Sequence, residues 1–359
     1  MKIDERQLVQ KVKKQMRSLI EDHRLGEIVS IQEEELLSKG DSYTRPDLVV
    51  TIRLKNGEQC KFIIEVKSVG EPRYIRAAIN QVQSYISDQE NEYGMIAAPF
   101  LTENTMNLSS AHDIGCIDLA GNCSIDFKNY FIKIKGNENS YSNKRSLKAL
   151  FSPKTTRILR VILCDPQKSW KVSELAKEAD VSLGQAANVK KKLLDEEFVT
   201  QTADKKIKMI NAERLLNEWV KNYSYRKNDI KNYYSMNSTE HIEEQIQQYF
   251  SSDQRRYAFT LTTGADIVKP YLRYKRVFLY LEFETIVDIA KRLQWKEVAS
   301  GPNITILEPY DSGIFYRMQN IQNKNVVCDI QLYLDLMSYK ERGEEAAQKI
   351  LEERIKPKW

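Results

Sequence analysis

The segment spanning residues 45–68 alternates apolar and polar positions with the period of two that a β-strand requires. A two-residue turn at Asn56-Gly57 would set apolar side chains against polar ones across the predicted hairpin. A three-residue loop over residues 55–57, with Gly57 in the left-handed conformation, keeps one face apolar instead. That face comprises Leu48, Val50, Ile52 and Leu54 on the first strand and Cys60, Phe62, Ile64 and Val66 on the second.

This register brings charged residues together at one end of the hairpin. Asp47 faces Glu65 across the strand pair, and Lys67 projects from the same face as Glu65, one pleat further on. The run FIIEV predicts a central, buried strand. Burial of a charged side chain costs free energy, so charges kept there indicate a functional role. The sequence therefore predicts a charged cluster at the end of a buried strand.

Hydrophobic periodicity predicts the other elements of the N-terminal part. Helices are expected over residues 4–24, 73–86 and 102–112, and strands within 27–37, over 93–99, over 116–119, and from the turn at Gly121-Asn122 to residue 134. This order of elements is typical of a mixed sheet with helices on both sides.

Beyond residue 145 the pattern changes. Residues 136–146 are polar and patternless, which predicts a linker. Three helices within 153–199 and two short strands within 198–210 follow, and from residue 211 helices and strands alternate to the end. We predict an α/β chain of three domains, over residues 1–140, 145–212 and 235–359.

The composition of the chain narrows the range of chemical functions that we expect of it. The 359 residues are 42% hydrophobic with 13 glycines and 9 prolines, as in globular proteins. No apolar run is long enough for a membrane span or a signal-peptide core, so we expect a cytoplasmic protein without membrane contact. Five cysteines without a C-x-x-C motif indicate reduced thiols, and three histidines leave little material for zinc sites or Ser-His-Asp hydrolysis. Catalysis by a metal ion that carboxylates bind is the class of chemistry that remains.

The charged cluster fits that chemistry. Two carboxylates, Asp47 and Glu65, and the backbone carbonyl of Val66 form an oxygen-ligand set suited to Mg²⁺ or Mn²⁺. The ion would polarise a scissile phosphate, while Lys67 would orient the attacking water or offset the growing charge. The alternative is a Glu-x-Lys surface pair on a strand, which is common in a chain with 29% charged residues.

The motifs PD at 46–47 and EVK at 65–67 resemble the PD-(D/E)XK, or restriction-endonuclease-like, nuclease superfamily. Gln81 and Tyr85 form the Q-x-x-x-Y pattern of RecB-like members, one helical turn apart. The resemblance implies a Mg²⁺-dependent deoxyribonuclease in which both side chains reach over the site. The alternative is an ordinary amphipathic helix whose tyrosine packs.

The sequence does not decide whether further acidic residues belong to the site. Family members often add an acidic residue from the first helix, and Glu5 and Glu21 are both candidates because no motif chooses between them. Asp118, in the string IDLAGN, is a candidate acid, but a strand ending in a tight turn explains it as well.

The string SELAKEADVSLGQAANVKKKLLDEEFV, with the strands after it, resembles a winged helix-turn-helix. The resemblance implies that the third helix enters the DNA major groove and that the wing meets phosphates. Residues 144–210 carry fifteen Lys and Arg against eight Asp and Glu, a net +7, as expected for a phosphate-binding surface. Winged helices that bind proteins are the alternative. The implied DNA contacts are Ser182, Gln185, Asn188, Lys191 or Lys192 on the helix, and Lys205 and Lys206 on the wing.

The strings ITILEP and QLYLDLMSYKERGEEAA resemble the C-terminal domain of abortive-infection (AbiE-type) antitoxins. Those proteins pair a winged helix with this domain and act on a nucleotidyltransferase-like toxin and its promoter, so a toxin-like partner is implied. We interpret Asp329, Asp335 and the step Arg342-Gly343-Glu344 as strand-end and helix-start residues rather than catalytic groups.

Two functions from different classes follow. The first is a metal-dependent DNA endonuclease of restriction or phage defence, which keeps costly charges together at Asp47, Glu65 and Lys67. The second is a non-catalytic DNA-binding transcriptional regulator or antitoxin that retains a nuclease fold. One nuclease site cuts one strand, so a double-strand break requires a homodimer or two sequential events. The tyrosine-rich residues 223–234 are our candidate for a dimer interface.

Overall fold

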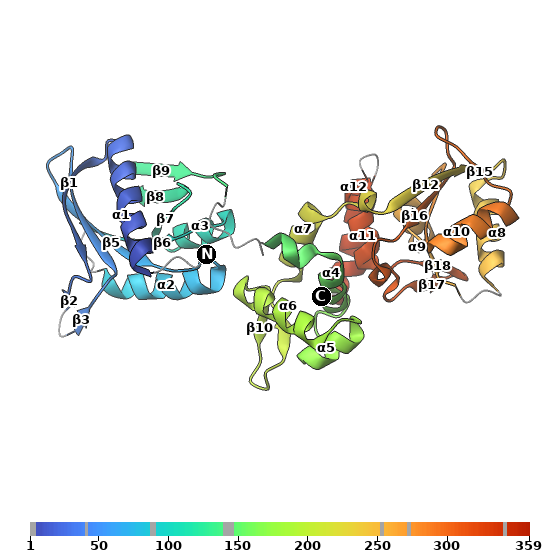
Figure 1. Cartoon of the computed structure of the whole chain (residues 1–359), viewed down its shortest axis with the longest axis horizontal. Helices are drawn as coiled ribbons and strands as arrows, with labels where there is room; N and C mark the ends of the chain where they lie inside the picture. Colours follow the sequence, from blue (N-terminus) through green and yellow to red (C-terminus); the bar gives the residue numbers. More distant parts are fainter. Residues whose placement is uncertain are drawn as a thin grey trace. The chain divides into compact units, whose positions relative to one another are not determined.

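The computed structural model describes residues 5–39, 42–86, 91–138, 147–251, 255–270, 274–339 and 343–359. The chain divides into two compact units (Figure 1), Met1–Ser146 with Asp195–Glu197, and Leu147–Leu194 with Phe198–Trp359. Most of the predicted linker, residues 139–146, lies outside the described residues. The helices that follow it share one compact unit with the C-terminal sheet, and the division into three domains stays a prediction.

A seven-stranded mixed sheet forms the first unit, in the order β1-β4-β5-β6-β7-β8-β9. The strands β5, β6 and β7 run parallel to one another, and the other neighbours are antiparallel. Their bounds are β1 Gly26–Glu33, β4 Leu48–Leu54, β5 Gln59–Val66, β6 Glu92–Ala98, β7 Gly115–Asp118, β8 Cys123–Phe127 and β9 Tyr130–Ile134. A separate pair, β2 Leu37–Lys39 and β3 Ser42–Thr44, lies between β1 and β4 in sequence.

Helices cover both faces of this sheet. The helix α1 (Glu5–Asp22) packs on one face, where Met16 and Ile20 join the apolar hairpin residues. The helices α2 (Pro72–Tyr85) and α3 (Glu103–Ser110) pack on the other face through residues such as Ile79 and Met106. Burial on both faces leaves few strand positions open to water.

The hairpin register is the predicted one. Leu48 pairs with Ile64 and Ile52 pairs with Cys60. The loop is closed by hydrogen bonds between Leu54 and Glu58 (N to O, 2.8 Å) and from the Gly57 N–H to the Leu54 carbonyl (2.9 Å). Gly57 has a φ of 87°, which favours glycine. The single strand predicted up to residue 134 is wrong, because the chain turns after β8 and returns as β9.

The second unit begins with four helices and a short hairpin. The helices are α4 Pro153–Cys164, α5 Val172–Glu178, α6 Leu183–Asp195 and α7 Ala212–Asn222, after a 3-10 turn η1 Leu147–Phe151. The strands β10 (Val199–Gln201) and β11 (Ile207–Met209) pair antiparallel between α6 and α7. This is the predicted order of helix, helix, turn, helix and hairpin.

A second seven-stranded sheet follows, in the order β15-β12-β16-β14-β13-β18-β17. Its strands are β12 Asp229–Tyr234, β13 Tyr257–Phe259, β14 Val277–Leu281, β15 Lys296–Glu297, β16 Ile304–Glu308, β17 Gln319–Ile321 and β18 Lys324–Val326. Its helices are α8 Thr239–Phe250, α9 Leu261–Val268, α10 Phe283–Arg292, α11 Asp329–Met337 and α12 Gly343–Ile350. Short 3-10 helices are η2 Tyr225–Lys227, η3 Ser312–Phe315 and η5 Lys356–Lys358, and η4 Leu351–Ile355 is a π-helix.

Two hydrophobic cores lie against this second sheet. One contains side chains of α8 and α10, and the other joins α9, α11 and α12 to the earlier helices α4 and α7. Tyr223, Tyr225 and Tyr233 are buried in these cores, so the prediction that this aromatic segment forms a dimer interface is wrong for them. The chain is an α/β protein with helices flanking mixed sheets, as predicted. Within the described residues, no helix has both the length and the apolar character to span a membrane.

Asp335 lies inside α11, so its interpretation as a strand-end or helix-start residue is wrong, and its buried side chain is the centre of a polar network. Its carboxylate accepts hydrogen bonds from Thr260 Oγ1 (2.5 Å), Gln331 Nε2 (2.9 Å), the Tyr280 hydroxyl (3.0 Å) and the Tyr223 hydroxyl. Burial raises the pKa of Asp335 to about 6, although these donors favour the charged form. The network joins α7, the sheet and α11.

The other C-terminal acidic residues also have structural roles. Asp329 begins α11 and accepts hydrogen bonds from Gln319 Nε2 (2.8 Å), Arg354 Nε (2.9 Å) and Lys358 Nζ (2.7 Å). Gly343 and Glu344 stand in the first turn of α12, as interpreted from the sequence, whereas residue 342 lies outside the described residues. These contacts explain the acidic positions without catalysis.

The raised pKa of Asp335 predicts a specific pH dependence of stability. Between about pH 4 and pH 6 the folded state holds a proton that the unfolded state has released, so the free energy of unfolding falls as pH rises. From pH 4.5 to pH 7, we expect the wild type to lose about 2 kcal/mol more than Asp335→Asn. Urea unfolding at both pH values measures this, with Asp229→Asn, on an exposed strand position, as the matched control. Equal pH dependence in wild type and Asp335→Asn would contradict it.

Candidate functional site

The five side chains predicted to form a nuclease site come together in the first unit. Asp47 stands just before β4, Glu65 lies at the end of β5 and Lys67 follows β5, while Gln81 and Tyr85 lie on α2. The position of Glu65 on β5 turns its side chain away from α1, toward the face that α2 covers. The strand ends and one helix therefore position the whole set.

A chain of hydrogen bonds connects these side chains. Lys67 Nζ donates to Glu65 Oε1 (2.6 Å) and to Gln81 Oε1 (2.9 Å). The Gln81 amide in turn donates to the Tyr85 hydroxyl. Asp47 Oδ2 accepts from the backbone N–H of Val66 (2.7 Å), which ties the start of β4 to the end of β5.

Glu65 is costly to keep in this position. Its side chain is only 5% exposed, and among the described residues its oxygen Oε2 accepts no hydrogen bond of normal geometry. A buried carboxylate oxygen without a partner destabilises the fold, because desolvation is not offset. Lys67, at 26% exposure, is the cation that compensates the charge.

Tyr85 is held in its neutral form. Burial raises the pKa of Tyr85, and the nearby charges of Glu65 and Asp47 raise it further, while the hydrogen bond from Gln81 opposes this shift. The hydroxyl therefore keeps its proton and can donate toward a ligand oxygen. Tyr85 lies near both carboxylates, as the Q-x-x-x-Y pattern predicts.

The donor set suits a hard divalent cation. Asp47, Glu65 and the main-chain carbonyl of Val66 offer oxygen ligands, and the unpaired Glu65 Oε2 is an acceptor that a cation would satisfy. Within the described ranges, this site included, no cluster of three or more His, Cys, Asp or Glu side chains is arranged to hold a metal, so the third oxygen here is a main-chain one. The arrangement is thus compatible with the predicted Mg²⁺ or Mn²⁺ ligands.

Asp118 and Glu21 do not join this cluster. Asp118 is buried and accepts from the backbone N–H groups of Asn122 (2.8 Å) and Leu101 (3.0 Å), so the tight-turn explanation holds for it. Glu21 is exposed on α1, which covers the opposite face of the sheet from α2. The side chain of Glu5 lies outside the described residues.

The predicted DNA-binding residues fall into two groups in the second unit. Ser182 and Gln185 have structural partners, because Ser182 Oγ accepts from the Gln185 backbone N–H (3.2 Å) and Gln185 Nε2 donates to Thr155 Oγ1 (3.0 Å). Asn188 and Lys191 are exposed on α6, one turn apart. Ser182 therefore caps α6, and Asn188 and Lys191 are the side chains free to reach a groove.

The hairpin tip lies close to the same helix. Lys205 is exposed at the tip, and Lys206 pairs with Asp204 at 2.7 Å. Lys190 Nζ approaches the Lys205 carbonyl at 3.5 Å, which brings α6 and the tip together. Sequence reasoning missed Lys190, although its place beside Lys191 and half-buried Lys192 in a lysine run was the available signal.

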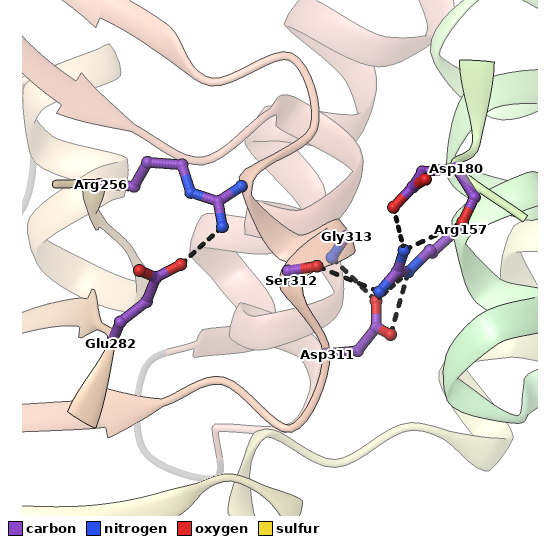
Figure 2. A network of polar contacts seen from close by, with 7 residues as sticks. All are labelled: Arg157, Asp180, Arg256, Glu282, Asp311, Ser312 and Gly313. Atoms are coloured by element: carbon purple, nitrogen blue, oxygen red, sulfur yellow. Dashed lines mark hydrogen bonds and ion pairs between the residues drawn. The ribbon is translucent and has the colours of Figure 1, made fainter. Parts of the chain in front are cut away.

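One arginine fixes the turn between α5 and α6 to the C-terminal part of the unit (Figure 2). Arg157 on α4 donates from Nε to both oxygens of Asp311 (2.8 and 3.0 Å), from Nη1 to Asp180 Oδ2 (3.0 Å) and from Nη2 to Ser312 Oγ (3.0 Å). Asp180 lies in the turn, and Asp311 caps η3. The turn is thereby fixed to the loop after β16.

Residues 208–356 match a family model described as transcriptional regulator, AbiEi antitoxin, Type IV TA system. The matched segment contains α7, the second sheet and α8 to α12. The resemblance of the C-terminal segment to AbiE-type antitoxins is thus confirmed, whereas the nuclease and winged-helix resemblances stay predictions.

No curated protein matches the chain. One solved structure, the crystal structure of a repair endonuclease from Pyrococcus abyssi, is 22% identical over 28% of this chain and 44% of that chain, with a TM-score of 0.20. The match thus spans less than half of that endonuclease. At this TM-score the likeness supports no argument about fold or activity.

The ion pair predicts opposite effects of two substitutions. Lys67→Ala leaves the buried Glu65 carboxylate without its cation, so we expect a loss of about 2 kcal/mol in the free energy of unfolding. Glu65→Gln removes the buried charge and should leave stability equal or higher. Urea unfolding, with hydrogen exchange of β5 peptides as the local readout, measures both.

Lys61→Ala is the matched control on the same strand. Lys61 is 42% exposed and 3.7 Å from Glu35, so its removal should cost less than about 0.5 kcal/mol. A loss in Glu65→Gln as large as that in Lys67→Ala would mean that the carboxylate stabilises the fold, which contradicts our interpretation.

Proposed function

We propose that this protein is a DNA-binding transcriptional regulator of the antitoxin kind. The observation that carries the proposal is the family match of residues 208–356, in a segment that shares one compact unit with the helices α4 to α6 and the β10–β11 hairpin. A regulator needs a surface that binds DNA, and we propose that α6 and the β10–β11 hairpin supply it.

Charge and exposure support DNA binding by this surface. Residues 144–210 have a net charge of +7, and Lys191 and Lys205 are exposed on α6 and on the hairpin tip. Lysines at these positions would contact phosphates and fix the register on the duplex, while Asn188 on α6 would meet base edges in the major groove. Lys192 and Lys206 would add to the phosphate contacts.

The antitoxin description also suggests a partner. A toxin-like protein encoded beside this chain is the expected counterpart, and the promoter that serves both is the expected DNA target. Arg157 would keep α6 in a fixed orientation toward DNA, because it links Asp180, in the turn before α6, to Asp311 and Ser312.

Removal of two lysines should weaken DNA binding measurably. We expect Lys191→Ala combined with Lys205→Ala to lower affinity for a duplex of the chain's own upstream region about tenfold, and to reduce the slope of log affinity against log salt by about two. Fluorescence anisotropy over a salt series measures both. Lys291→Ala, an exposed lysine in the last turn of α10, should change affinity less than twofold. Wild-type affinity in the double variant would refute the assigned surface.

A second candidate function is metal-dependent endonuclease activity of the first unit. The buried, unpaired oxygen of Glu65 favours it, because a retired site has no reason to keep a destabilising carboxylate. Asp47, Glu65 and the Val66 carbonyl would hold Mg²⁺ or Mn²⁺. Such an ion polarises the scissile phosphate and lowers the pKa of a bound water.

The remaining side chains would position the DNA and the attacking water. Lys67 would orient the attacking water or offset charge on the phosphorane, and Gln81 would keep the Lys67 ammonium in place through their 2.9 Å hydrogen bond. Tyr85, whose hydroxyl is protonated near neutral pH, would donate a hydrogen bond to the backbone of the DNA. Cleavage of both strands would require a homodimer or two successive events.

Plasmid cleavage tests the second candidate. With Mg²⁺ or Mn²⁺, we expect wild type to nick supercoiled DNA, and Asp47→Ala and Lys67→Ala to be slower by at least about 100-fold. Lys61→Ala, on the same strand but outside the cluster, should cut like wild type. If wild type leaves DNA uncut under conditions where it binds DNA, the first unit is not a nuclease and the regulator proposal stands alone.

A further inference from the structure

Two cysteines far apart in the sequence meet inside the second unit. Cys164 ends α4, and Cys328 is the residue that caps the N-terminus of α11. Each thiol shifts the pKa of the other, so the two side chains lie close together. Both line a cavity of about 300 Å³ that also contacts Arg317, Arg354 and Trp359. A small solute can therefore approach a pair of neighbouring thiols.

The surroundings of Cys328 favour a thiolate. The hydrogen bond from Cys164 and the charge of Arg160 lower the pKa of Cys328, although burial opposes this shift. Arg160 is buried, and among the described residues its Nε and Nη1 atoms have no hydrogen-bond partner. The free amides at the start of α11 also favour a negative charge there. Three features thus favour a negative charge on the Cys328 sulfur.

The three other cysteines have a different environment. Cys60, Cys116 and Cys123 are buried on strands of the first sheet. Burial raises the pKa of Cys116 to about 12 and that of Cys123 to about 11, so these thiols stay protonated and unreactive near neutral pH. They provide an internal control within the same chain.

We propose that Cys164 and Cys328 are a redox modification site that closes to a disulfide when the protein meets hydrogen peroxide. In the first step, the Cys328 thiolate attacks one peroxide oxygen, which forms a sulfenic acid and releases hydroxide. In the second step, the Cys164 sulfur attacks the sulfenic sulfur, the S–S bond forms and water leaves. In total, two thiols and one peroxide give one disulfide and two waters.

The bond would join two elements of different origin. It would link the end of α4, which belongs to the helices before the family match, to the start of α11 inside the matched segment. Both helices already contribute to one hydrophobic core. The disulfide would therefore lock an existing contact rather than require a rearrangement.

Thiol counting and peptide mapping of the full chain test the proposal. After brief treatment with hydrogen peroxide, free thiols should fall from the five of the sequence to three, and return to five with a dithiol reductant. Mass spectrometry of the alkylated digest should show one linked peptide pair that contains Cys164 and Cys328.

Two variants separate the roles. In Cys164→Ser, a dimedone trap should label the sulfenic acid at Cys328, because the resolving thiol is missing. In Cys328→Ser, Cys164 should remain unlabelled and reduced. The wild-type peptide map needs no variant, so poor folding of either variant leaves the test intact. Five unchanged thiols, equal oxidation of Cys60, Cys116 and Cys123, or oxidation of Cys328 without a cross-link would each overturn the proposal.

Discussion

The pairing register of β4 and β5 determines where every charged group of the first unit lies. Strand side chains alternate between faces, so a slip by one residue would move Glu65 to the face that α1 covers. The three-residue loop that ends at Gly57 prevents this slip and sets the carboxylate toward α2. Gln81 and Tyr85 then meet Lys67 because they occupy one face of that helix.

The second unit depends on buried polar contacts instead of a register. Asp335 gathers donors from α7, the sheet and α11, while Arg157 holds the turn before α6 against the loop after β16. Polar groups in such places are satisfied only when every partner is in position, so they define one arrangement of the helices against the sheet. The basic surface of α6 is therefore coupled to the integrity of the matched segment.

The sequence predicted the hairpin, its loop and the five clustered side chains, because each depends on local alternation or on helical spacing. It did not predict that the Gln185 side chain has an internal partner, since Thr155 is distant in sequence and only the fold brings it near. The buried positions of Tyr223 and Tyr233 were equally hidden, because an aromatic run looks the same at an interface and in a core. The meeting of Cys164 and Cys328 required the tertiary structure.

The topology of the second sheet has a consequence for the order of folding. β12 pairs with β16, and the core that holds α4 and α7 includes α11, so its last partners are more than 150 residues downstream of α4. Contacts between residues so far apart in the sequence form late, and they make folding slow. During synthesis, the helices α4 to α6 emerge first but lack part of their core until α11 has left the ribosome. A truncated chain would thus display the basic helix without the support that orients it, and only full-length molecules would carry a correctly built DNA surface.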